Sequence, residues 1–97
     1  NMNRLNARSE DLLHEIAKNI MRLEQTVEKG DLELIEEIAH TIKKQSIDME
    51  CTEIKDRAFK IELAARRGNM GDAIENIKKI KKEVGKLQNN FIAFEEE

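Results

Sequence analysis

Apolar residues recur at intervals of three and four positions along almost the whole chain. The succession of Ile16, Ile20 and Leu23 illustrates the pattern in the first third of the sequence. Such spacing places apolar side chains on one face of an α-helix, whereas a half-buried strand would alternate. The pattern predicts four helices, over residues 10–28, 32–47, 52–66 and 70–92. The pattern leaves open whether residues Asn3–Ala7 form a short extra helical turn before the first helix.

Two glycines mark the ends of predicted helices. Gly30 and Gly68 each follow a long periodic segment, and glycine readily adopts the left-handed conformation that often ends a helix. Asp31 and Asn69 come next, and their side chains suit the start of a new helix. Ser9 similarly precedes acidic residues that suit the positive end of a helix dipole. Because the connections are short, the sequence predicts an all-α fold, an antiparallel up-down-up-down four-helix bundle.

The composition supports this fold class. The chain has 97 residues, of which 39% are hydrophobic and 3% aromatic, and it contains no Pro and no Trp. This length suits a single domain over residues 1–97, and an all-β domain would need more β-branched and aromatic residues. No uninterrupted apolar run is longer than Phe91–Phe94, so no membrane-spanning segment is expected. The single Cys51 and the lack of an apolar segment near the start favour a reducing, cytoplasmic compartment.

The charge distribution argues against nucleic acid as a partner. The formal net charge is −3, with 17 basic and 20 acidic residues. The most basic stretch, between Lys78 and Lys86, alternates with apolar residues and has no aromatic residue on which a base could stack. We interpret it as the solvated face of an amphipathic helix.

Two histidines occur in the predicted helices, and neither lies in an apolar stripe. At about 100° per residue, His40 falls roughly 165° from the apolar centre of its helix, and His14 about 155° from the centre of its own. His14 is interpreted as a solvated side chain. His40 differs, because Lys43 and Lys44 share its face and disfavour protonation of the imidazole. The exposed Ile47 extends this face, which predicts a docking surface around a neutral, nucleophilic His40.

A metal site is the alternative for these histidines. The spacing Glu37-x-x-His40 also occurs in bundles that bind two metal ions through carboxylates. Those sites need a second such motif and two further carboxylates, all projecting into the bundle. Asp11 and His14 share the spacing, but both pairs point outward in the predicted helices. A metal site is therefore not expected, and the sequence contains no catalytic triad, phosphate-binding glycine loop or zinc cluster.

The stretch from Gly30-Asp31 to Ala39-His40-Thr41-Ile42-Lys43 resembles histidine phosphotransfer (HPt) domains. The family pattern is a Gly-Asp turn, a short helical lead and then Ala-His-x-Leu-Lys-Gly. The similarity continues without a gap through the third predicted helix to the turn at Gly68-Asn69. It covers most of the chain, from about Leu12 to Leu87.

This resemblance implies a phosphoryl carrier. His40 would accept a phosphoryl group from an aspartyl phosphate on a response-regulator receiver domain and pass it to another receiver, while Lys43 and Lys44 stabilise the group. The surface for docking would include Ile47, Glu36 and Glu37. The Mg²⁺ and the acidic pocket belong to the receiver, so the resemblance implies no cofactor, no ATP site and no enzyme activity for this chain. Its partners would be receiver domains and a hybrid histidine kinase, and it would act as a monomer without direct membrane contact.

The sequence departs from the family pattern after the lysine. Lys44 stands where the family usually has Gly, Gln45 where a small residue follows, and Glu50-Cys51 where the family has Gly-Ala. Lys44 either crowds the approach of the receiver or adds a second cation. These departures keep open a second interpretation, in which the chain is a helical interaction module that binds receivers without relaying phosphate.

A competing resemblance involves the first histidine. His14-Glu15-Ile16 is similar to the start of the H-box in the dimerisation helices of histidine kinases. The expected Asn is out of register at Asn19, and no Pro follows. A kinase would also need an ATP-binding domain, so this interpretation is disfavoured.

Overall fold

The computed structural model describes the backbone of residues 2–96 and the side chains of residues 7–90. Within this range the chain forms helices and short turns, with no β-strand. The helices are α1 (Met2–Lys29), α2 (Leu32–Asp48), α3 (Thr52–Arg66) and α4 (Met70–Glu96). The predicted all-α class is confirmed, and both ends of α2 and α3 lie within one residue of their predicted positions.

The outer ends of α1 and α4 differ from the prediction. α1 is continuous from Met2, whereas the sequence predicted a helix from residue 10 with at most a separate turn over Asn3–Ala7. No Gly or Pro interrupts the first ten residues, so nothing stops the helix at Ser9, which lies inside α1. α4 likewise runs on to Glu96. Phe91, the last residue of the apolar pattern, lies outside the described side chains.

The two glycine turns follow the sequence prediction. Gly30 and Gly68 have φ values of 69° and 74°, in the left-handed region. Asp31 Oδ1 accepts a hydrogen bond from the backbone N–H three residues further on, at 3.1 Å. Asn69 Oδ1 does the same at 3.0 Å. These side chains bind otherwise unpaired N–H groups at the starts of α2 and α4.

The turn between α2 and α3 is built differently. Glu50 has a φ of 58°, the same left-handed conformation in a residue that carries a Cβ. Its backbone N–H donates to the carbonyl of Ile47 at 3.0 Å, so this conformation also ends a helix. The family that the sequence resembles has Gly at this position. Gly has no Cβ, so it adopts the left-handed conformation without a steric clash.

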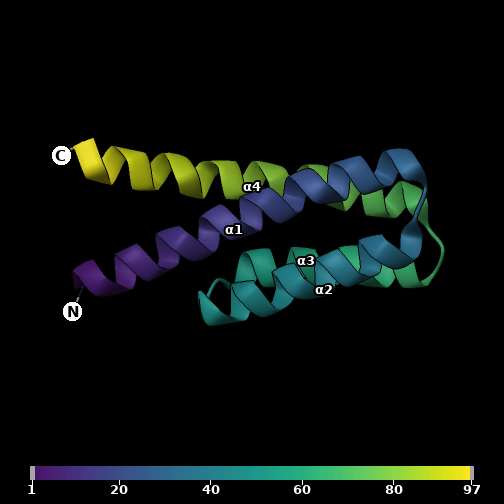
Figure 1. Cartoon of the computed structure of the whole chain (residues 1–97), viewed down its shortest axis with the longest axis horizontal. Coiled ribbons are helices and arrows are strands. Elements are labelled where there is room, and N and C mark those ends of the chain that lie inside the picture. Colours follow the sequence, from purple (N-terminus) through teal and green to yellow (C-terminus); the bar gives the residue numbers. More distant parts are fainter. Residues whose placement is uncertain (1, 97) are drawn as a thin grey trace.

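Each helix packs against the next one along the chain, and α4 packs against α1 to close the bundle. The helices alternate in direction, and both ends of the chain lie at the same end of the molecule (Figure 1). α1 and α4 extend beyond the turn that joins α2 to α3, which gives the molecule its elongated shape of 44 × 20 × 17 Å. The core is aliphatic and draws on all four helices: Leu13, Ile16, Leu23, Ile35, Ile42, Ile54, Ile61 and Ile80. None of the helices in the described range is long and apolar enough to cross a membrane.

Candidate functional site

His40 lies near the middle of α2, and half of its side-chain surface is exposed to solvent. The neighbouring Ile38, Ala39 and Ile42 are buried in the core. The burial of these three residues shows which face of α2 points into the bundle. The imidazole projects from the opposite side of the helix, as the helical phase of the sequence predicted.

A carboxylate on α3 hydrogen-bonds the imidazole. Glu62 Oε2 lies 2.9 Å from His40 Nδ1, and the Glu62 side chain is only 4% exposed. Its other oxygen, Oε1, accepts from Lys43 Nζ at 2.8 Å, and Arg66 donates to Oε2 at 3.3 Å. A buried carboxylate is stable only when paired and hydrogen-bonded, and Glu62 has three such partners.

The sequence analysis missed Glu62, although a signal for it was present. Glu62 follows Ala58 by four positions, so it lies on the face of α3 that carries the buried Ala58 and Ile61. A charged residue on an apolar face is uncommon and needs a partner from another element. The identity of that partner depends on how α2 and α3 pack, which the spacing does not give.

The partners of Glu62 hold its carboxyl group in the ionised form. Burial alone would raise the pKa of Glu62, but hydrogen bonds from Lys43 and His40 outweigh it and bring the pKa below its ordinary value of 4.5. An ionised carboxylate can only accept a hydrogen bond, so near neutral pH the proton between the two side chains belongs to His40 Nδ1. In a neutral imidazole the other nitrogen, Nε2, then carries the lone pair.

Arg66 connects this arrangement to α2. Its Nε atom donates to Glu36 Oε2 at 2.9 Å while its Nη2 atom reaches Glu62. The hydrogen bond and charge of Glu36 raise the pKa of Arg66, so the guanidinium remains charged. Glu36, which the sequence placed in the docking surface, is thus paired within the chain.

The two lysines after His40 have different environments. Lys43 has 22% of its side-chain surface exposed, binds Glu62, and holds its Nζ atom 5.0 Å from the centroid of the Phe59 ring. Lys44 is exposed, and within the described residues it forms no ion pair. The sequence placed both lysines on the face of His40, and of these two the structure pairs Lys43 with Glu62 and leaves Lys44 without an ion pair among the described residues.

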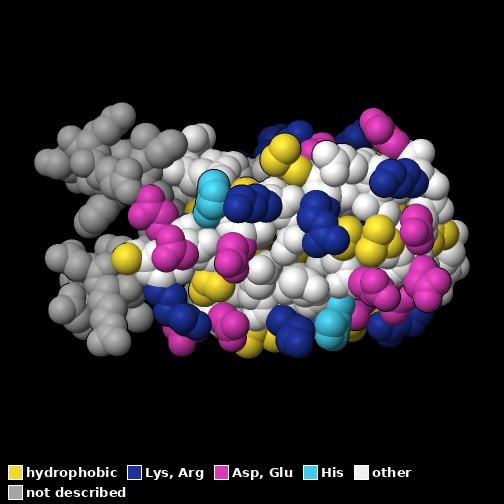
Figure 2. Space-filling view, in the orientation of Figure 1, with side chains coloured by type: hydrophobic (Ala, Val, Ile, Leu, Met, Phe, Trp, Pro, Cys, Tyr) yellow, Lys and Arg dark blue, Asp and Glu magenta, His cyan; other side chains and the backbone are white. Residues whose placement is uncertain are grey.

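The surface on the two sides of His40 differs in chemistry. Toward the start of α2, His40 borders a shallow pocket of about 550 Å³, lined by Glu33, Glu36, Glu37, His40, Thr41 and Glu62. Toward the end of α2 the surface carries Ile47 and Phe59, whose exposed fractions are 53% and 43%. Figure 2 shows a cluster of acidic side chains beside the histidine over α2, on the side toward the start of that helix.

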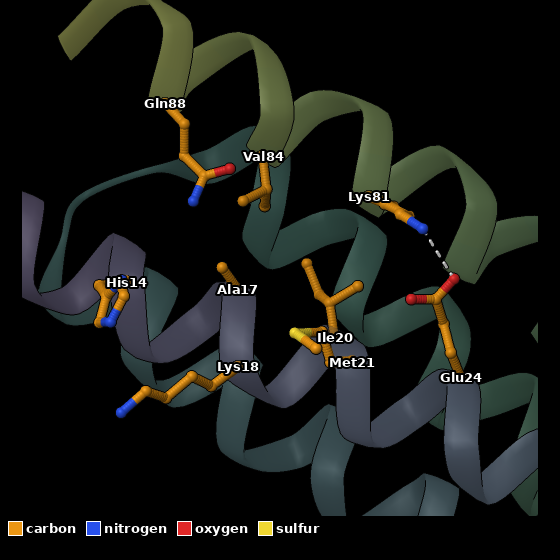
Figure 3. Close-up of a pocket in the computed structure, with 9 residues that line it drawn as sticks. All are labelled: His14, Ala17, Lys18, Ile20, Met21, Glu24, Lys81, Val84 and Gln88. Carbon is orange, nitrogen blue, oxygen red and sulfur yellow. Dashed lines mark hydrogen bonds and ion pairs between the residues drawn. The ribbon is translucent and has the colours of Figure 1, made fainter. Parts of the chain in front are cut away.

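His14 lies elsewhere, at a groove of about 350 Å³ between α1 and α4. Ala17, Ile20 and Val84 line the groove, and an ion pair of 3.0 Å between Lys81 and Glu24 lies at its other end (Figure 3). Within the described residues no carboxylate hydrogen-bonds His14, so its ring lacks the fixed orientation that Glu62 gives to His40.

The described residues contain no group of three His, Cys, Asp or Glu side chains placed to hold a metal ion. Glu37 and His40 have the spacing of a di-metal motif, but both are exposed on the outside of the bundle. The ring nitrogen of His40 that faces the protein, Nδ1, is hydrogen-bonded to Glu62 and is not free to ligate a metal ion.

The sequence was compared with models of known protein families. The model described as the Hpt domain matches residues 9–90. The chain belongs to the Hpt domain family. Hpt domains are phosphoryl carriers of two-component signalling, not catalysts, and they interact with the other proteins of a phosphorelay. Comparisons with curated proteins and with solved structures gave no match.

Proposed function

We propose that His40 is the phosphoryl-accepting residue of this Hpt domain, and that Nε2 is the nucleophilic atom. The observation that carries the proposal is the 2.9 Å contact between Nδ1 and the buried Glu62. This contact places the ring proton on Nδ1 and leaves the lone pair on Nε2. His14, the other histidine, has no comparable partner among the described residues.

The transfer is a displacement at phosphorus. The Nε2 lone pair attacks the phosphorus of an aspartyl phosphate on a receiver domain, and a nitrogen–phosphorus bond forms as the phosphorus–oxygen bond to the aspartate breaks. The bonding electrons leave with the aspartate as a carboxylate. The proton on Nδ1 stays on the ring, and the negative charge of Glu62 offsets the positive charge that the ring acquires. Transfer to a second receiver reverses these steps.

The remaining predicted residues have supporting roles in this proposal. Lys44 supplies an exposed cation for the phosphoryl group or for the acidic pocket of the receiver, and Lys43 can reach the phosphoryl group only by leaving Glu62. Ile47 and Glu37 contribute to docking, together with the paired Glu36. The Mg²⁺ that the reaction needs is supplied by the receiver. The partners are receiver domains and a hybrid histidine kinase, and the chain acts as a cytoplasmic monomer.

Labelling with phosphoramidate, a small phosphoryl donor that needs no docking surface, tests the assignment. The wild type and His14→Gln should acquire an acid-labile phosphoryl group and release it to isolated receiver domains, whereas His40→Gln should release none. Phosphate passed from His40→Gln to a receiver would overturn the assignment. Wild type that binds receivers without ever carrying phosphate would favour the alternative, a helical interaction module.

A further inference from the structure

The surface around His40 is electrostatically divided. On the side toward the start of α2, Glu33 and Glu37 are exposed, and within the described residues neither forms an ion pair. Glu36 lies between them in the same pocket, but Arg66 neutralises it at 2.9 Å. Two uncompensated negative charges therefore border the imidazole on this side.

The other side of His40 is apolar and cationic. Ile47 and Phe59 are two of the three large hydrophobic side chains that are exposed in the described part of the chain. Lys43 lies against the Phe59 ring and one helical turn before Ile47, so it links the two apolar side chains into one patch. Lys44 adds an exposed positive charge next to His40.

We propose that this division sets both the orientation and the selectivity of docking, an inference that rests on the proposed phosphoryl transfer. The receiver places its acidic phosphorylation pocket toward Lys44 and an apolar surface over Ile47 and Phe59. It must then present a basic side chain to Glu33 and Glu37, because an acidic or neutral group there would leave the two carboxylates repelled or desolvated. The chain therefore selects receivers that carry a basic residue beside the phosphorylated aspartate.

The acidic pocket is better matched to a side chain of the partner than to a metal ion. A divalent ion needs several carboxylates that converge, and the described residues contain no such group. Arg66 also occupies the carboxylate of Glu36. A lysine or arginine on a docking partner needs only the two exposed carboxylates.

The experiment uses the full chain labelled on His40 with phosphoramidate, so that labelling is independent of docking. Transfer rates are measured to a panel of isolated receiver domains, which is divided by the charge of the residues beside the aspartate. The wild type should transfer about tenfold faster to receivers with a basic flank than to those with an acidic flank. Glu33→Lys combined with Glu37→Lys should reverse this order, and high salt should reduce both preferences.

Two control variants separate the halves of the surface. Glu75→Lys reverses one charge on the exposed surface of α4, where Glu75 pairs with Lys79 at 3.2 Å, and should leave the order of receivers unchanged. Phe59→Ala combined with Ile47→Ala should slow transfer to all receivers alike, whereas Met21→Ala, which truncates the exposed hydrophobic residue of α1, should not.

The outcomes distinguish the inference from the proposed function. If His40 is labelled and transfers its phosphate, but the double lysine variant keeps the wild-type order of receivers, the docking inference is wrong and the carrier function stands. If no receiver removes the phosphate, or His40 is never labelled, the proposed function fails and the inference fails with it.

Discussion

At the scale of single residues, Glu62 determines how His40 can react. A solvated imidazole exchanges its proton between both nitrogens and turns freely about its side-chain bonds. The ionised, buried Glu62 removes both freedoms, because it accepts a hydrogen bond only from Nδ1. In the proposed transfer it is a positioning residue, because it lies behind the ring and would act on the phosphoryl group only through the imidazole.

Replacement of this carboxylate should slow labelling of His40. Glu62→Gln removes the charge and places an amide beside Lys43 and Arg66, so we expect phosphoramidate labelling to slow by about 10- to 100-fold, as for other residues that orient a reactive histidine. Nitrogen NMR should show the proton fixed on Nδ1 in the wild type and shared between both nitrogens in the variant. Glu37→Gln removes a carboxylate that lines the same pocket but makes no hydrogen bond to the ring, and it should retain the wild-type rate. Equal rates in all three proteins would show that Glu62 has no positioning role.

The two adjacent lysines should differ in their contribution to stability. Lys43→Ala deprives the buried Glu62 of its shortest hydrogen bond, so we expect a loss of about 1–3 kcal/mol in the free energy of unfolding. Lys44→Ala removes an exposed side chain and should change it by less than about 0.5 kcal/mol. Urea unfolding of both variants measures the difference. Similar values would mean that Lys43 is as solvated in solution as Lys44.

At the scale of helices and turns, the three connections solve the same problem with different residues. Gly30 and Gly68 adopt left-handed conformations at no steric cost, and Asp31 and Asn69 then cap the next helices. Glu50 adopts the same backbone conformation with a Cβ present. The turn between α2 and α3 is therefore the strained connection, and it joins the two helices that carry His40 and Glu62.

Glycine at this turn should stabilise the protein. Glu50→Gly relieves the left-handed Cβ at the expense of a more flexible unfolded chain, so we expect a net gain of about 0.5–1 kcal/mol in the free energy of unfolding. Gly30→Ala places a Cβ at the equivalent position and should lose about 1 kcal/mol. Thermal or urea unfolding measures both. A loss of stability in Glu50→Gly would show that the Glu50 side chain makes a compensating interaction.

At the scale of the whole molecule, the bundle separates two surfaces. The packing of α2 against α3 brings His40 and Glu62 together, whereas α1 and α4 form a separate groove beside His14 (Figures 1 and 3). The charges buried between α2 and α3 also link the stability of the bundle to pH.

The free energy of unfolding should fall in acid through Glu62. The pKa of Glu62 is lower in the folded protein than its ordinary value of 4.5, so ionisation of Glu62 stabilises the folded state. This stabilisation is complete at pH values above that ordinary pKa. This contribution is lost as the pH falls from 4.5 through the lower folded pKa, because the unfolded chain then binds the proton more readily. The difference in stability between the wild type and Glu62→Gln should therefore narrow over this interval in urea titrations. A difference independent of pH would show that Glu62 is not ionised in the folded protein.

The sequence by itself determined the features that depend on neighbouring positions. The spacing of Ile35, Ile38 and Ile42 fixes the inner face of α2, so it also predicted the outward direction of His40. Gly30 and Gly68 marked the ends of helices because a left-handed residue is a local requirement of the backbone. The start of α1 was predicted wrongly because a serine such as Ser9 can either cap the start of a helix or lie inside one. The residues before Ser9 include no Gly or Pro, and the helix therefore begins earlier, at Met2.

The contacts between helices were decided only by the tertiary structure. Glu62 is 22 residues from His40, and Arg66 is 30 residues from Glu36. A helical period gives the direction of a side chain around its own axis, but it does not give the rotation and the shift of one helix against another, which depend on how all the core side chains fill the space between them. The sequence could thus name an exposed histidine with two lysines. The packing of α2 against α3 determined that one lysine is bound to a buried carboxylate and that the same carboxylate fixes the proton of the histidine.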